Sequence, residues 1–135
     1  MTPCFVDTYF FLALLRADSA GHDRALEENR VNRKMFTTWF VLLELADHLC
    51  DQKNRHLFSM ILRAIEADNR FEVIAVDSDL LLRGLELYST RPDKNWSLTD
   101  CTSFVVMADR AITDALTGDR HFVQAGFRAL LAPSF

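Results

Sequence analysis

Five short apolar runs alternate with longer stretches of helical character, and this alternation restricts the fold more than any other feature of the sequence. The short runs have the length of strands and comprise residues 3–6, 35–38, 71–75, 113–117 and 127–131. The longer stretches comprise residues 8–17, 22–33, 39–50, 56–67, 78–88 and 98–110. Strands separated by helices predict a parallel sheet that is covered on both faces. We therefore expect an α/β three-layer sandwich with a central sheet of about five strands.

The size and composition of the chain favour one domain over residues 1–135. A chain of 135 residues that is 50% hydrophobic can bury one ordinary core, and no stretch rich in Gly, Pro or Ser suggests a linker. No apolar run approaches the roughly 20 residues that cross a bilayer, and no basic segment typical of a signal peptide precedes the first run. The cysteines are scattered and odd in number, which favours a reducing cytoplasm over a disulfide framework. We expect them to fill the core: Cys4, Cys50 and Cys101.

Several carboxylates are placed where the strands of such a sheet would end. In open parallel sheets, ligands bind beyond the carboxyl ends of the strands, where the following helices also begin. Asp7 directly follows the first apolar run and Asp119 follows the fourth. Asp100 begins a helix whose preceding loop returns from that edge, and Glu44 lies in the helix after the second run. Asp114 is excluded, because it precedes Asp119 by five residues and should lie roughly 16 Å away at the opposite end of its strand.

Two of these acids have simple structural explanations at the start of a helix. Asp7 could be the N-cap of the first helix, and Asp is a preferred residue at that position. Position alone leaves this role and a ligand role equally open for Asp7. Ser97 and Asp100 have the S-x-x-D spacing of a capping box, and Asp100 also lies near the positive end of the helix dipole. Spacing alone therefore favours a capping role for Asp100.

The other two acids also have ordinary alternatives. Glu44 lies on a polar helix face that is typical of a solvated surface. A metal shared by Glu44 and His48, one turn apart, is disfavoured because no further Cys or His has zinc-type spacing. Asp119 could cap a short helix in DRHFVQA, and we expect the neighbouring His121 to be an exposed polar residue.

Convergence of the four acids at one edge, however, indicates a bound cation. Two carboxylates about 4 Å apart repel each other by about 4 kcal/mol at an effective dielectric constant of 20. Oxygen ligands without zinc-type spacing favour Mg²⁺ or Mn²⁺, ions that promote phosphodiester hydrolysis by activating water and stabilising the leaving oxygen. The net charge of -4 argues against an indiscriminate nucleic-acid binder, but the nineteen acids outnumber the fifteen bases by only the four that a metal would neutralise. Three basic residues near the same edge could contact phosphate groups: Arg91, Lys94 and Arg120.

Four segments in this order resemble the PIN-domain ribonucleases, in particular the VapC-like toxins of bacterial toxin-antitoxin pairs: FVDTYFFLALL, TTWFVLLELADHL, WSLTDCTSFVVM and ITDALTGDRHFVQAGF. The resemblance covers essentially the whole chain, and the last two segments together are its most specific part. It implies a PIN-like sandwich and a quartet of metal-binding, catalytic acids, with Thr99 ordering the site. Independently of the resemblance, Ser97 would support the site by capping the helix that carries Asp100. The implied quartet is Asp7, Glu44, Asp100 and Asp119.

The same resemblance implies a cytoplasmic, Mg²⁺- or Mn²⁺-dependent endoribonuclease that forms a homodimer and is inhibited by a small antitoxin inserting a segment near the acids. Two alternatives stay open: a PIN-fold module that binds RNA or protein without cleavage, and a housekeeping PIN nuclease without an antitoxin. Two other phosphate-handling folds fit poorly. A haloacid-dehalogenase-like phosphatase would need an Asp where Tyr9 stands, and a receiver domain would need a Lys after its fifth strand.

Overall fold

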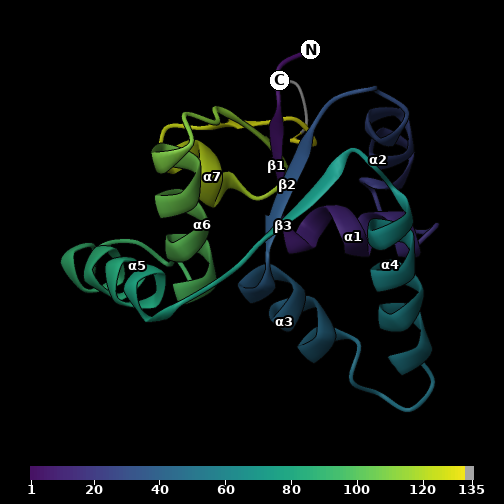
Figure 1. The fold of residues 1–135 in the computed structure, drawn as a ribbon, viewed down its shortest axis with the longest axis horizontal. Helices are drawn as coiled ribbons and strands as arrows, with labels where there is room; N and C mark the ends of the chain where they lie inside the picture. Colours follow the sequence, from purple (N-terminus) through teal and green to yellow (C-terminus); the bar gives the residue numbers. More distant parts are fainter. Residues whose placement is uncertain (133–135) are drawn as a thin grey trace.

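The computed structural model describes residues 1–132 and contains a five-stranded parallel sheet, which confirms the predicted α/β sandwich (Figure 1). The strands are β1 Cys4–Val6, β2 Met35–Thr38, β3 Phe71–Ile74, β4 Asp114–Leu116 and β5 Arg128–Ala129. They are arranged in the order β3-β2-β1-β4-β5, and all four neighbouring pairs are parallel. The first strand of the chain therefore lies in the centre of the sheet.

Helices lie on both sides of this sheet (Figure 1). In Figure 1, α1, α2 and α4 lie to the right of the strands and α5, α6 and α7 to the left, while α3 lies below them and contacts α1, α4 and α6. Among the described residues, no helix is long and apolar enough to cross a membrane. The helix bounds are α1 Thr8–Leu15, α2 His22–Asn29, α3 Trp39–His48, α4 Arg55–Ala67, α5 Ser78–Thr90, α6 Leu98–Asp109 and α7 Arg120–Gln124.

The central strand and the aromatic residues of the flanking helices form the core. All three residues of β1 are fully buried, as expected for a central parallel strand covered on both faces. On the α6 side, the Phe104 ring packs edge-to-face against Trp96 and Phe122, with ring centroids 5.1 and 5.0 Å apart. Cys4 and Cys101 are buried as predicted, but Cys50 is exposed, so its assignment to the core was wrong.

Each predicted element is present, with differences at its ends. The largest concerns α2, which ends at Asn29 although the apolar pattern predicts helix to residue 33. The Arg70 guanidinium explains this end, because its Nη1 atom donates to the backbone carbonyls of Asn29 and Val31 at 2.7 and 2.9 Å. These carbonyls are thereby fixed in the connection that leads into β2. Differences of two residues occur at α1 and α3, which end earlier than predicted, and at α5, which extends to Thr90.

The strand order creates a switch point between β1 and β4. The chain passes from β1 outward to β2 and β3, and then returns across the sheet to form β4 on the other side of β1. The connections leaving β1 and β4 therefore diverge, and this divergence opens the crevice in which α/β sheets of this kind bind ligands. Asp7 directly follows β1, and the Thr117–Asp119 segment directly follows β4.

Candidate active site

A pocket of about 300 Å³ is located at this switch point. All four acids predicted from the sequence line it, although they come from four separate segments of the chain. We call it the acidic pocket, and its lining includes Asp7, Thr8, Tyr9, Glu44, Asn95, Ser97, Asp100, Asp119 and His121. As predicted, Asp114 lies outside the pocket, at the first position of β4 and therefore at the far end of the strand; there it pairs with Arg128.

Asp7 is held by a hydroxyl on the neighbouring strand end. Its side chain is only 4% exposed, and its Oδ2 atom accepts a hydrogen bond of 2.8 Å from the Thr117 hydroxyl. Asp7 occupies the N-cap position of α1, but its side chain makes no capping bond, so it does not act as a cap. Burial raises the pKa of Asp7 to about 7; the Thr117 hydrogen bond opposes this rise, and the charges of Asp100 and Glu44 add to it.

Asp100 combines a capping role with a position in the pocket. The Ser97 hydroxyl accepts a hydrogen bond from the backbone N–H of Asp100 at 3.0 Å, and Asp100 Oδ2 accepts one from the Ser97 N–H at 3.2 Å. This is the predicted capping box. Asp100 is buried, and burial raises its pKa, with a further rise from the charge of Asp119. The cap therefore fixes a carboxylate that also faces the pocket.

Glu44 is positioned by the junction between β2 and α3 and by a hydrogen bond from Thr8. The Thr38 hydroxyl caps α3 by accepting a hydrogen bond of 3.1 Å from Val41 N–H, which sets where the helix begins. One turn and a half later, Glu44 Oε1 accepts a hydrogen bond of 2.6 Å from the Thr8 hydroxyl. Glu44 thus faces the pocket rather than bulk solvent. His48 bonds to the backbone carbonyl of Glu44 through Nδ1, at 2.9 Å.

Asp119 and His121 form the fourth corner of the pocket. Asp119 Oδ1 accepts a hydrogen bond of 2.9 Å from His121 N–H, so Asp119 caps the short helix α7 as its position suggested. The His121 Nδ1 atom lies 3.1 Å from Asp100 Oδ2 and 3.3 Å from Asp119 Oδ1. The prediction that His121 is an ordinary exposed residue was therefore wrong. The one sequence signal for this arrangement is the position of Asp119 as the expected N-cap of a short helix. A capping carboxylate lies close to the residues that follow it.

The donor atoms of this corner suit a divalent cation. Ligand atoms of Asp100, Asp119 and His121 lie within 4.8 Å of one another. Two carboxylates and an imidazole nitrogen match the preferences of Mn²⁺ and other first-row ions, and the carboxylates also match Mg²⁺. Burial is the main cause of the raised pKa values of Asp7 and Asp100, and neighbouring carboxylates raise both further, so ionisation of all the acids would need compensating positive charge. A divalent cation would supply that charge.

The remaining predicted residues, which are Thr99, Arg91, Lys94 and Arg120, do not line the acidic pocket. The backbone carbonyl of Thr99 accepts a hydrogen bond from the Thr102 hydroxyl. The hydroxyls that contact the acids belong to Thr8 and Thr117. Arg91 and Lys94 line a neighbouring pocket, and Arg120 is exposed at the first position of α7.

Tyr9 forms part of the pocket wall and packs against two glycines. A Cβ atom on Gly118 would lie 2.5 Å from the Tyr9 ring, and one on Gly21 would lie 3.2 Å from it. Gly118 separates Thr117 from Asp119, so the ring packs directly against the segment that carries the fourth acid. The absence of a side chain at residue 118 is what allows this close approach.

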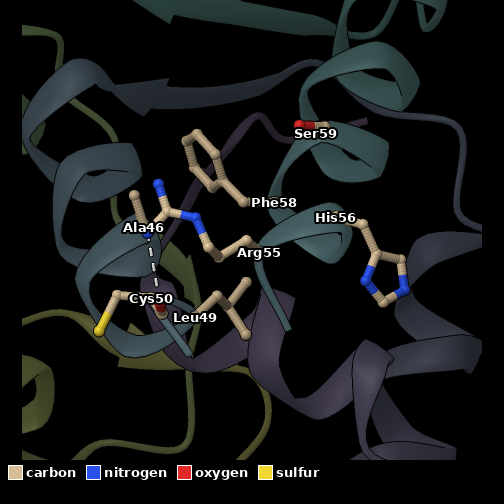
Figure 2. Close-up of a pocket in the computed structure, with 7 residues that line it drawn as sticks. All are labelled: Ala46, Leu49, Cys50, Arg55, His56, Phe58 and Ser59. Carbon is tan, nitrogen blue, oxygen red and sulfur yellow. Dashed lines mark hydrogen bonds between the residues drawn. The ribbon is translucent and has the colours of Figure 1, made fainter. Parts of the chain in front are cut away.

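A further pocket of about 300 Å³ lies between α3 and α4, away from the acids (Figure 2). Arg55 closes one side by donating from Nη1 to the Cys50 carbonyl at 3.2 Å. Figure 2 shows the Cys50 thiol and the His56 ring on opposite sides of the Arg55 side chain. This pocket holds none of the predicted site residues.

Comparisons with known proteins show similarity over most of the chain. The chain is 29% identical over 123 residues to the 23S rRNA-specific endonuclease VapC20 of Mycobacterium tuberculosis, covering 91% of this chain and 94% of that protein. Its structure resembles the crystal structure of the same VapC20, described as a sarcin-ricin loop cleaving toxin, with a TM-score of 0.81 over 92% of this chain and 95% of that one.

More distant structures share the fold. FitAcB from Neisseria gonorrhoeae has a TM-score of 0.66 at 13% identity, covering 93% of this chain and 95% of that one. VapBC2 from Rickettsia felis, bound to a DNA fragment from its promoter, has a TM-score of 0.66 at 14% identity, covering 95% and 96%. Residues 4–128 match the PIN domain. The protein belongs to the PIN-domain family.

Proposed function

We propose that this protein is a metal-dependent endoribonuclease and the toxin of a toxin-antitoxin pair. The observation that carries the proposal is the convergence of Asp7, Glu44, Asp100 and Asp119 on one pocket at the β1–β4 switch point of a PIN domain. The similarity to VapC20 extends over more than nine-tenths of both chains and supports RNA as the substrate. Ribosomal RNA, with the sarcin-ricin loop as the first sequence to test, is the proposed target.

The proposed roles follow from the contacts in the pocket. Asp7, Glu44, Asp100 and Asp119 would hold Mg²⁺ or Mn²⁺, with His121 as a neighbouring nitrogen donor. When bound, such an ion activates water for attack on a phosphodiester and stabilises the charge on the leaving oxygen. Two hydroxyls hold carboxylates in place, Thr117 on Asp7 and Thr8 on Glu44, and the backbone N–H of Ser97 holds the carboxylate of Asp100. These bonds fix the acids before substrate arrives, which lowers the cost of reorganisation.

Substrate binding in this proposal relies on basic residues around the pocket. A net charge of -4 weakens the overall attraction of the chain for RNA, and bound metal would neutralise part of the negative charge at the pocket. Arg91 and Lys94, in the loop before α6, and Arg120, directly after Asp119, are the proposed phosphate contacts.

A toxin role implies a specific cellular context. We propose that the protein acts in the cytoplasm as a homodimer and that a small antitoxin covers the acidic pocket. Complexes named VapBC, from Rickettsia felis and Salmonella typhimurium, share the fold. Expression alone should arrest growth, and co-expression of the antitoxin should relieve the arrest. Harmless expression, with no co-purifying partner, would favour a housekeeping nuclease.

Cleavage of RNA with substituted acids tests the proposal directly. Wild-type protein should cleave an RNA containing the sarcin-ricin sequence with Mg²⁺ or Mn²⁺ and should not cleave it in EDTA. Asp7→Asn and Asp100→Asn should each abolish cleavage while leaving the circular dichroism spectrum unchanged. Asp47→Asn is the matched control, because Asp47 is an exposed acid on the same helix as Glu44 and lies outside the pocket. Full activity in either pocket variant would refute the site, and RNA binding without cleavage by wild type would favour the non-cleaving alternative.

A further inference from the structure

A second pocket, of about 540 Å³, adjoins the acidic pocket beside the loop between α5 and α6. We call it the Tyr88 pocket, and its lining includes Tyr88, Arg91, Lys94, Asn95 and Trp96. Asn95 lines both pockets, so the two are neighbours along one surface. The acidic pocket is lined by four acids, whereas the lining of the Tyr88 pocket contains two bases, which share the single carboxylate of Asp93 as their partner.

The wall of the Tyr88 pocket is held in place independently of any ligand. The Arg91 guanidinium donates to Asp93 from Nε and Nη2 at 3.1 and 3.2 Å, and it lies 5.1 Å from the centroid of the Trp96 ring. Trp96 is buried, and its indole N–H donates to Gln124 Oε1 at 3.1 Å. Asp93 and Trp96 therefore hold the Arg91 guanidinium in a fixed position in the wall of the pocket.

The same loop is coupled to the acidic pocket. Directly after Trp96, the Ser97 N–H donates to Asp100 Oδ2, the carboxylate that also contacts His121. Asn95 is two residues from Ser97, so their Cα atoms are at most about 7 Å apart. A chain that passes from one pocket to the other therefore needs to span only a short distance.

The groups that remain available in the Tyr88 pocket suit a nucleotide. Lys94 Nζ lies 3.9 Å from Asp93 Oδ2, the limit of an ion pair, and its ammonium can also bind a phosphate. Tyr88 is 49% exposed, and an exposed aromatic ring at such a place can stack on a base. The Asn95 amide can pair with a base edge or a 2′-hydroxyl. A volume of about 540 Å³ is within the range of roughly 300–1,000 Å³ of ligand pockets.

We propose that the Tyr88 pocket binds the nucleotide of the RNA substrate that adjoins the scissile bond, with its base on Tyr88 and its phosphate at Lys94. This inference rests on the proposed endoribonuclease function. The scissile phosphate then lies over the acids, where a metal compensates the charge, and the neighbouring nucleotide lies where the protein itself supplies positive charge. Single-stranded or unpaired residues of RNA fit this arrangement, because only an unstacked base can reach the tyrosine.

Binding and cleavage of a sarcin-ricin RNA hairpin test this proposal. Tyr88→Ala should weaken RNA binding, measured by fluorescence anisotropy in EDTA, by roughly 5- to 100-fold, the loss expected for one stacked base. It should raise KM more than it lowers kcat. Tyr88→Phe should restore most of the affinity, because the ring is kept. Lys94→Ala should weaken binding and reduce its salt dependence, whereas Lys53→Ala is the matched control because Lys53 is exposed in the α3–α4 connection.

Crosslinking separates this proposal from the proposed function. RNA carrying 4-thiouridine next to the cleavage site should crosslink to wild-type protein within residues 88–96. A crosslink and a Tyr88→Ala binding defect without metal-dependent cleavage would support the binding site and contradict the nuclease. Cleavage and binding that are unchanged in Tyr88→Ala, or crosslinks confined to other segments, would overturn the proposal. Normal RNA binding together with loss of antitoxin binding in Tyr88→Ala would assign the surface to the protein partner instead.

Discussion

The Thr117 hydroxyl lies 2.8 Å from Asp7 Oδ2, although 110 residues separate the two in the sequence. The same hydroxyl oxygen accepts a hydrogen bond of 3.0 Å from the backbone N–H of Asp119. One fully buried side chain therefore joins the acid that follows β1 to the segment that carries the acid following β4. Parallel pairing of Val6 with Leu116 brings these two strand ends together.

Replacing this hydroxyl should damage both stability and activity. We expect Thr117→Val, which keeps the shape of the side chain, to lower the free energy of unfolding by about 1–3 kcal/mol, because the buried Asp7 carboxylate and the Asp119 N–H lose their partner. RNA cleavage should fall as Asp7 and Asp119 lose their fixed positions. Thr117→Ser keeps the hydroxyl and should therefore retain more stability and more cleavage activity than Thr117→Val. Urea denaturation and a cleavage assay on the two variants provide the measurement, and equal stability of Thr117→Val and wild type would contradict the role.

Metal-free protein should become less stable as the pH rises from about 4 to about 7. The pKa of Asp7 is raised to about 7 in the folded state from an ordinary value of 3.8, chiefly by burial. A carboxyl with a raised folded pKa binds its proton more tightly in the folded state, so its contribution is favourable at low pH. That contribution is lost as the pH rises through this interval. Burial of Asp100 raises its pKa as well and acts in the same direction.

Asp7→Asn isolates this effect, because it removes the titrating group. In EDTA, its advantage in unfolding free energy over wild type should grow between pH 4 and pH 7, to at most about 4 kcal/mol. Thermal unfolding of both proteins across this pH range measures the difference, and added Mn²⁺ should stabilise wild type more than the variant. A difference that is independent of pH would show that Asp7 ionises normally in the folded protein.

The sheet and the convergence of the acids were predictable because both depend on periodic features. Parallel strands share one carboxyl edge, so Asp7 and Asp119 had to lie on it once the strands were identified. The capping box of Ser97 and Asp100 is a local motif whose partners are three residues apart. In both cases, the geometry follows from secondary structure without knowledge of the tertiary packing.

The contacts of His121 and Glu44 could not be predicted in the same way. His121 reaches Asp100 only because α7 packs beside the start of α6. The two residues are 21 positions apart, and this separation alone does not predict a tertiary contact. Glu44 belongs to a polar helix face, and its hydrogen-bond partner Thr8 lies 36 residues earlier in the sequence. The exposure of Cys50 likewise depends on where α3 ends.

His121 should matter for metal affinity. Its Nδ1 atom contacts the carboxylates of both Asp100 and Asp119, so it either orients these ligands or donates to the ion itself. We expect His121→Ala to weaken Mn²⁺ binding roughly 10- to 100-fold, the usual cost of removing a group that orients metal ligands. Titration calorimetry measures this, with His48→Ala as the matched control, because His48 lines the same pocket but bonds to a backbone carbonyl. Equal Mn²⁺ affinities of the two variants would show that His121 contributes no more to metal binding than His48 does.

Gly118 should not tolerate a side chain, because the Tyr9 ring occupies the space. A Cβ at this position would lie 2.5 Å from Tyr9 Cζ and 2.6 Å from its hydroxyl oxygen. We expect Gly118→Ala to lower the free energy of unfolding by about 1–3 kcal/mol and to reduce cleavage, because the displaced ring or backbone shifts Asp119. Gly21→Ala, whose Cβ would meet the same ring at 3.2 Å, should be milder. If the clash is the cause, combining Gly118→Ala with Tyr9→Ala should recover part of the lost stability, and additive effects in this double-mutant cycle would place the cause elsewhere.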